Sequence, residues 1–220
     1  MADAKKRVGI LISGRGSNMA SLIEAARDPA YPAEIACVLS NRPDAAGLKL
    51  AQDAGIPAIA VDHNAFADRP AFENALDAEL KAFRVDLVAC AGFMRIMTPG
   101  FVAGWRDRML NIHPSLLPAF PGLDTHQRAL SEGVKLAGCT VHLVRADVDD
   151  GPIIAQAAVP VVDGDTPESL AARVLQAEHK LYPHALALFA SGAVKVCNGR
   201  VAGPQVPVNQ EKALFSPPLT

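Results

Sequence analysis

The sequence lacks any hydrophobic run close to the roughly 18 residues that a membrane-spanning helix requires. It also lacks an excess of basic residues, because 21 lysines and arginines stand against 23 aspartates and glutamates, for a formal net charge of −2. Proteins that hold nucleic acid through bulk charge need a basic surface to neutralise phosphates, so that class is excluded. The short basic start of the chain leads into an apolar run that ends at once in a glycine turn, which predicts a first strand and not a signal peptide.

Cysteine is scarce and widely spaced. The four cysteines, Cys37, Cys90, Cys139 and Cys197, form no CxxC pair and have no close histidine, so the spacing predicts no zinc or other metal site. Cys37 and Cys90 lie inside apolar runs and are predicted to be small buried side chains. This usage favours a reducing, cytoplasmic setting.

What is present indicates a packed domain. Half of the 220 residues are hydrophobic and 20% are charged, and the length suits one α/β domain. Strand-length apolar runs alternate with amphipathic helical stretches, which predicts a Rossmann-like, mainly parallel sheet with helices on both faces. We expect a single domain over residues 1–203, made of halves at about 1–105 and 106–203, followed by a loosely ordered tail at 204–220.

The expected strands are Arg7–Ile12, Glu34–Leu39, Ala58–Val61, Leu87–Ala91, Met109–Ile112, Cys139–Val144 and Ile153–Val159. The expected helices are Asn18–Arg27, Ala45–Ala54, Arg69–Phe83 (capped by Asp68), a short one near His126–Glu132, and a long one from the Thr166 cap to about Phe189. A final hairpin is expected to turn at Asn198-Gly199.

The segment Ser13–Asn18 joins the first strand to the first helix. At this place in an open parallel sheet, free N–H groups and the helix dipole favour a phosphate, and Gly16, Ser17 and Asn18 suit a close approach. The plain alternative is a tight turn with a helix cap. A nicotinamide cofactor is a further alternative, but the third glycine of its fingerprint is Met19 here, and Arg42 rather than an acid follows strand two. Arg42 suits a 2′-phosphate, so an NADP-dependent oxidoreductase stays open.

Asn111 and His113 lie two residues apart at the carboxyl end of a predicted strand. Strand alternation directs both side chains to one face, at the edge where such sheets bind ligands. An amide that stabilises an oxyanion and an imidazole that moves a proton together suit acyl transfer. The alternative is a histidine that only hydrogen-bonds a loop.

Two other segments could have either a functional or a purely structural role. In the acidic turn Asp147–Gly151, a carboxylate could orient His113, although such turns are more typical of a solvated surface. Met94–Met97 follows a strand end and could line an apolar cleft, although taken alone the segment is more typical of core.

Taken together, the segments resemble the phosphoribosylglycinamide formyltransferase family. The resemblance runs from about Val8 to about Asn198. It depends on LISGRGSNM, AGFMRIM, LNIHPSLLPAFPGLDTH, DDGPII and RVLQAEHKLYP. The NxHPSLLP motif is shared with other formyl-folate enzymes. Another formyl-folate-dependent transferase or hydrolase is therefore a further alternative for the function. The glycine loop and PGLDTH separate this chain from those relatives, as does the expected absence of an added nucleic-acid-binding domain.

The resemblance implies transfer of a formyl group from 10-formyltetrahydrofolate, as co-substrate, to the amine of glycinamide ribonucleotide in purine biosynthesis, by a monomer or weak homodimer. It makes the first half the phosphate-binding half and the second the folate and catalytic half. The catalytic residues implied are Asn111, His113 and Asp149. The ribonucleotide-binding residues implied are Gly16, Ser17, Asn18 and Glu178. The folate-binding residues implied are Arg69, Met94, Arg95, Ile96, Met97, Asn111, Arg145, Ala146, Asp147, Val148 and Asp149.

Two positions depart from the family pattern. Asp124 stands where close relatives often carry histidine, so we expect that position to be dispensable. Asp150 replaces a more usual glycine, so we expect altered geometry in the turn that holds Asp149; aspartate tolerates a positive φ better than most residues do.

Overall fold

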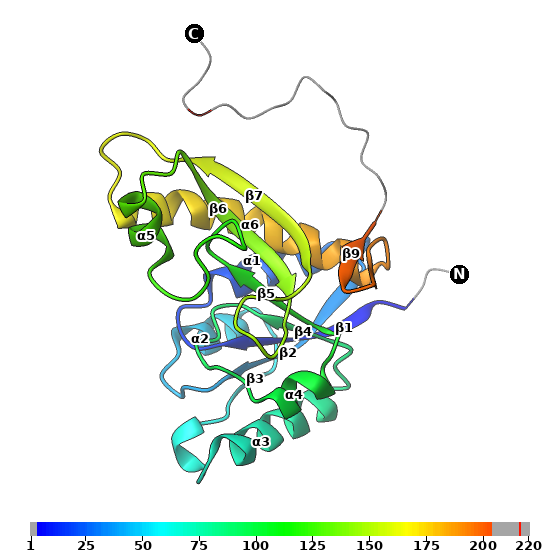
Figure 1. Ribbon diagram of the computed structural model, residues 1–220. Helices are drawn as coiled ribbons and strands as arrows, with labels where there is room; N and C mark the ends of the chain where they lie inside the picture. The colour runs from blue at the N-terminus through cyan, green and yellow to red at the C-terminus, as the bar shows by residue number, and fades with distance from the viewer. Residues whose placement is uncertain (1–3, 204–215, 217–220) are drawn as a thin grey trace.

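A computed structural model describes residues 4–203 and Ser216, and the expected tail at 204–220 lies outside the described residues apart from Ser216. Its centre is a seven-stranded sheet in the order β3-β2-β1-β4-β5-β6-β7, drawn in Figure 1. The first five strands pair in parallel, whereas β6 and β7 are antiparallel. The predicted mainly parallel α/β sheet is therefore confirmed, and strands from both expected halves of the domain share it.

The strands are β1 (Lys6–Ile12), β2 (Ala33–Ser40), β3 (Ala58–Ala60), β4 (Leu87–Cys90), β5 (Met109–His113), β6 (Leu136–Leu143) and β7 (Ile153–Pro160), with a separate hairpin of β8 (Lys195–Cys197) and β9 (Arg200–Ala202). The helices are α1 (Ser17–Ala26), α2 (Ala46–Asp53), α3 (Arg69–Ala82), α4 (Pro99–Gly104), α5 (Thr125–Ser131) and α6 (Pro167–Ala190), with a 3-10 turn, η1 (His63–Ala65).

The sheet separates two apolar layers, because alternate residues of its strands face opposite sides. Val8, Ile10 and Ile12 of β1 pack with α1 and α6, whereas Leu11 faces the layer built by α3 and α4. Figure 1 shows α3 and α4 on one side of the sheet and α5 and α6 on the other. This is the two-faced cover that the alternating pattern predicts.

Side-chain caps mark the starts of α3 and α6. The Asp68 side chain accepts from the Ala71 N–H at 2.8 Å and starts α3, and Thr166 and Ser169 form a capping box at the start of α6. Asn198 and Gly199 both have positive φ, 51° and 75°, as a tight hairpin turn requires. The sequence interpretation missed α4, which has only six residues, and η1.

None of the described helices combines the length and apolarity needed to cross a membrane.

Candidate functional site

The carboxyl ends of β1, β4 and β5 meet at one edge of the sheet. The buried Tyr182 hydroxyl of α6 joins two of these strands, because it lies 3.0 Å from the Cys90 carbonyl oxygen and 3.3 Å from that of Leu110. At the end of β5, Asn111 and His113 lie on one face, as strand alternation predicts. The side chains of both approach partners contributed by β6 and the loop after it.

Asp149 is the partner of His113. Its Oδ2 lies 3.2 Å from His113 Nδ1, and both side chains are less than a tenth exposed. The other ring nitrogen of His113, Nε2, lies 3.0 Å from the Phe120 carbonyl oxygen. Both ring nitrogens therefore face acceptors, and only the doubly protonated imidazolium can donate to both at once.

The Asp149 side chain is the exception in an otherwise solvent-exposed turn. Asp149 takes a left-handed conformation with φ 56° and accepts from the Gly122 N–H at 2.9 Å. Burial raises the pKa of its carboxyl, but the Gly122 N–H and the neighbouring His113 imidazole help to hold this pKa below the ordinary value. The solvated-loop interpretation is thus wrong for Asp149, and the positive φ falls on Asp149 itself rather than on Asp150.

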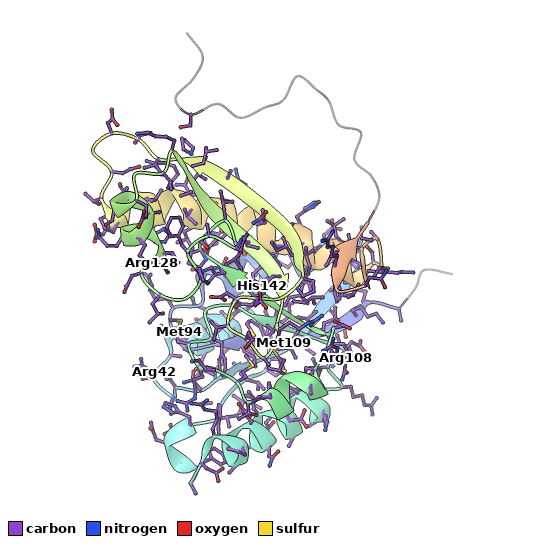
Figure 2. All side chains as sticks on the ribbon, viewed as in Figure 1. Arg42, Met94, Arg108, Met109, Arg128 and His142 are labelled. Atoms are coloured by element: carbon purple, nitrogen blue, oxygen red, sulfur yellow. The ribbon has the colours of Figure 1, made fainter. Side chains whose placement is uncertain are left out.

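His142 is the functional candidate that sequence reasoning missed. It is 2% exposed on β6, opposite Asn111 in the antiparallel register, and its Nε2 lies 3.2 Å from Asn111 Nδ2 and 3.7 Å from Asp149 Oδ1. Its Nδ1 lies 3.0 Å from the Leu143 carbonyl oxygen, which assigns the ring proton to Nδ1 and leaves Nε2 to accept from Asn111. The available signal was an isolated histidine inside the apolar run Thr140–Val144. Figure 2 labels His142, which lies on β6 within the sheet.

His126 at the start of α5 also borders this cluster. Burial and the neighbouring His113 lower the pKa of His126. Asp124, where close relatives often carry histidine, takes a left-handed conformation with φ 55° just before α5. Its backbone conformation therefore shapes the start of that helix.

A cavity of about 490 Å³ opens beside the glycine loop. Gly16 takes φ 76° directly before α1, so the loop bends there with its backbone close to the cavity. Its wall includes Gly16, Ser17, Asn18, Arg42, His63 and Arg95. In Figure 2 Arg42 and Met94, which both line it, lie on the same side of the view. Backbone N–H groups at a helix start and several cationic side chains suit an anionic ligand.

Asn18 and Glu178 meet at the inner end of this region. Asn18 Nδ2 donates to Glu178 Oε2 at 2.7 Å, and both residues are at least nine-tenths buried. Burial raises the pKa of the Glu178 carboxyl, and the bond from Asn18 opposes that rise only in part. The Asn18 amide nitrogen is therefore already engaged by Glu178.

The segment after β4 is open to solvent. Met94 and Ile96 are 69% and 62% exposed, and Val148, within the acidic turn, is 52% exposed. The core interpretation is thus wrong for Met94 and Ile96, although Met97 packs against the buried layer under α3. Exposed apolar side chains beside polar groups are typical of a ligand cleft.

The other predicted folate-binding residues lie around this opening with different surroundings. Ala146 and Asp147 are exposed in the acidic turn, and Arg69 is exposed at the start of α3. Arg145 forms an ion pair with Asp107 and donates to the Val144 carbonyl at 3.0 Å, so its guanidinium is engaged away from His113.

Within residues 4–203 and Ser216, no group of three or more histidine, cysteine, aspartate or glutamate side chains is arranged to hold a metal ion.

The formyl transferase family model matches residues 6–186, so the chain belongs to the formyl transferase family.

Individual relatives and solved structures within this family are similar to the chain over most of its length. The chain is 43% identical to the phosphoribosylglycinamide formyltransferase of Escherichia coli, over 85% of this chain and 88% of that one. It is 52% identical to the bovine trifunctional purine biosynthetic protein adenosine-3 over 90% of this chain, but it spans only 20% of the length of that relative. Among solved structures, glycinamide ribonucleotide transformylase 1 from Symbiobacterium toebii matches with a TM-score of 0.87 and 49% identity, covering 90% of this chain and 93% of that one.

Proposed function

We propose that this protein transfers the formyl group of 10-formyltetrahydrofolate to the amine of glycinamide ribonucleotide, giving the formylated ribonucleotide and tetrahydrofolate, as a step of purine biosynthesis. The observation that carries the proposal is the cluster of Asn111, His113, Asp149 and His142 beside a cavity suited to an anion. The names of the relatives above support the same substrates.

His113 is the proton-carrying group of this proposal. Asp149 holds Nδ1 at 3.2 Å, so Nε2 is the nitrogen whose N–H can exchange the Phe120 carbonyl for a substrate atom. In its charged form His113 would stabilise the oxyanion that forms when the amine attacks the formyl carbon. It would then give its proton to the departing folate nitrogen. A positioned proton donor of this kind typically contributes about 10²–10⁴-fold in rate.

Asn111 supplies the second oxyanion donor. Its amide gives one N–H to His142 Nε2, which orients the group and leaves its other N–H for the formyl oxygen. Loss of one such donor typically costs about 10²–10³-fold in kcat. His142 thereby acts through Asn111.

The cavity beside the glycine loop would hold the ribonucleotide. Its phosphate would contact Gly16, Ser17 and Asn18 at the start of α1, where free N–H groups point outward. Since Asn18 already donates to Glu178, we expect it mainly to position that carboxylate, which would contact the glycinamide portion.

The co-substrate would lie over the exposed apolar side chains Met94, Ile96 and Val148, which fit a flat ring system. Arg69, Arg95, Met97, and the segment Arg145–Asp149 complete this proposed cleft. The cytoplasmic setting, and a monomer or weak homodimer without nucleic-acid or membrane partners, belong to the same proposal. All four cysteines are free, as a reducing setting requires.

The test combines the protein with glycinamide ribonucleotide and 10-formyltetrahydrofolate and follows folate absorbance. Omitting the ribonucleotide separates transfer from hydrolysis of the formyl group, and titration with NADPH, followed by fluorescence, examines the oxidoreductase alternative. Turnover without the ribonucleotide, or tight NADPH binding, would favour those alternatives.

Variants test the assignment of His113. His113→Ala is expected to lower kcat at least about a hundredfold with the fold intact. His184→Ala, at an exposed histidine of α6, is the matched control and is expected to retain kcat. A folded His113→Ala protein with near-normal turnover would reject the role of His113.

A further inference from the structure

The segment 92–98, between β4 and α4, has no helical or strand hydrogen bonding of its own. It nevertheless carries Met94, Arg95, Ile96 and Met97, which the proposed function places against the co-substrate. An irregular segment with exposed apolar side chains must take its shape from other parts of the fold. Two buried side chains supply that support, one at each end.

Ser13 holds the first end. Its N–H donates to the Gly92 carbonyl at 3.0 Å, and its hydroxyl oxygen accepts from the Met94 N–H at 2.8 Å. The same hydroxyl donates to Asn41 Oδ1 at 2.6 Å. Because Ser13 begins the glycine loop, this end of the segment is shared with the anion cavity.

Glu73 of α3 holds the other end. It is 5% exposed, and its carboxylate accepts from the Thr98 N–H at 2.7 Å and from the Thr98 hydroxyl. Thr98 Oγ1 in turn accepts from the Phe101 N–H at 3.3 Å and caps α4. Glu73 therefore fixes both the backbone and the side chain of the residue at which the segment ends.

Burying the Glu73 carboxyl group costs folding free energy that its hydrogen bonds must offset. Among residues 4–203 and Ser216, no lysine, arginine or histidine nitrogen comes within 4.0 Å of it, so this carboxyl group is buried without an ion pair. Phe72, the residue before it, and Leu76, three residues further along α3, are core residues. What the carboxylate provides instead is its pair of bonds to Thr98.

Other residues of α3 also meet the segment. The Arg95 guanidinium lies 5.5 Å from the centre of the Phe72 ring, in cation–π geometry. Arg69 lies four residues before Glu73 and so on the same side of α3. The amino-terminal half of α3 thus packs against the segment that forms the proposed co-substrate cleft.

We propose that Glu73 is a positioning residue for binding of the formyl-folate co-substrate. It touches neither substrate. It holds Thr98, and through Thr98 it holds the segment 92–98 in the shape that receives the co-substrate. This inference rests on the proposed function, because that function assigns the segment to the folate.

Asp77 offers a matched control for Glu73. It lies one turn further along α3 and accepts from Trp105 Nε1 at 3.0 Å, so it also joins α3 to the α4 region but at the far end of α4. Glu73→Ala and Asp77→Ala each remove a hydrogen-bonded contact of α3, and both are expected to lower thermal stability. Only Glu73→Ala releases the segment 92–98.

The experiment measures kcat, both KM values and Tm for the full chain and its variants. Glu73→Ala is expected to raise KM for 10-formyltetrahydrofolate about tenfold or more, as loss of hydrogen bonds to a charged acceptor allows. KM for the ribonucleotide should rise less than KM for the folate, because Ser13 still holds the end of the segment that borders the anion cavity. Asp77→Ala should leave both KM values within about threefold. Glu73→Gln is expected to restore the folate KM, because its Oε1 can accept from the Thr98 N–H and its amide can donate to Thr98 Oγ1.

An unchanged folate KM in Glu73→Ala, or an equal rise in Asp77→Ala, would overturn the inference. If Glu73→Ala does not fold, Thr98→Ala removes the hydroxyl that bonds Glu73 and caps α4, keeps the N–H bond to Glu73, and must raise the same KM. Failure of the proposed function has a different signature: the wild-type chain itself would then not transfer the formyl group.

Discussion

The turn that carries Asp149 packs against β6 so closely that it has no room for a side chain at Gly151. A Cβ atom added there would lie 1.6 Å from the Leu143 carbonyl oxygen, 2.7 Å from the Leu143 carbonyl carbon and 3.3 Å from His142 Nδ1. Leu143 also donates its N–H to the Pro152 carbonyl at 2.9 Å, so the turn is bonded to the strand at this point. Gly151→Ala is therefore a perturbation aimed at the placement of Asp149.

The size of the effect follows from the geometry. Cβ atoms in real structures essentially never come within 3.0 Å of such a neighbour, so the two groups must separate by at least 3.0 − 1.6 = 1.4 Å. Leu143 is fully buried and paired with Leu110 of β5, so the turn moves rather than the strand. A misplacement of about 1 Å in a catalytic group can cost about 10²-fold in rate, and we expect kcat to fall by about that factor.

Steady-state kinetics and a thermal melt measure this prediction. The matched control is Gly104→Ala at the end of α4, where an added Cβ meets nothing within 4 Å. We expect that control to keep kcat and to gain up to about 1 kcal/mol, because alanine loses less backbone entropy than glycine in a helix. A Gly151→Ala protein with wild-type kcat would show that the position of Asp149 does not limit the reaction.

Three further predictions concern stability and reactivity. Tyr182→Phe removes the hydroxyl that bonds the Cys90 and Leu110 carbonyls without leaving a large cavity. Calorimetry should therefore show that the free energy of unfolding falls by about 1 kcal/mol, or Tm by about 2–4 °C. An unchanged Tm would contradict this. With a thiol reagent on the native protein, only the exposed Cys197 should react quickly, because burial raises the pKa of the other three thiols to about 12; rapid modification of more than one thiol would refute their burial. The folded-state pKa of Asp149 is below its unfolded value, so its carboxylate adds stability at neutral pH that is lost as the pH falls through the folded pKa. Urea unfolding should therefore show an advantage of wild type over Asp149→Asn at pH 7 that shrinks in acid, and a constant difference would count against the coupling.

Helix and strand positions followed from local signals wherever an element was long enough to show a period. The spacing of Phe72, Leu76 and Leu80, together with the Asp68 cap, predicted α3 to within a residue at its carboxyl end. The same approach missed α4, although Thr98 caps it and Pro99 begins it. Six residues are too few for a helical period to stand out, and α4 is stabilised by tertiary contacts such as that between Trp105 and Asp77.

The site was predictable in part. Alternation along one strand was enough to put Asn111 and His113 on the same face. His142 was missed because its place opposite Asn111 depends on the antiparallel register of β5 and β6, which no local pattern encodes. The acidic turn misled for a similar reason, since acidic residues usually face water and only the fold shows Asp149 against His113.

The sequence by itself determined the order of the longer strands and helices, the glycine loop before α1, and the pairing of an amide with an imidazole on one strand, because each of these depends on neighbours within a few residues. Only the tertiary structure decided that Asp149 is buried with a left-handed backbone, that His142 joins the cluster, and that Glu73 holds Thr98. The contacts of Glu73 with Thr98, of Asp149 with His113 and of His142 with Asn111 join residues 25 or more positions apart, and their energies exist only once the sheet has brought the segments together.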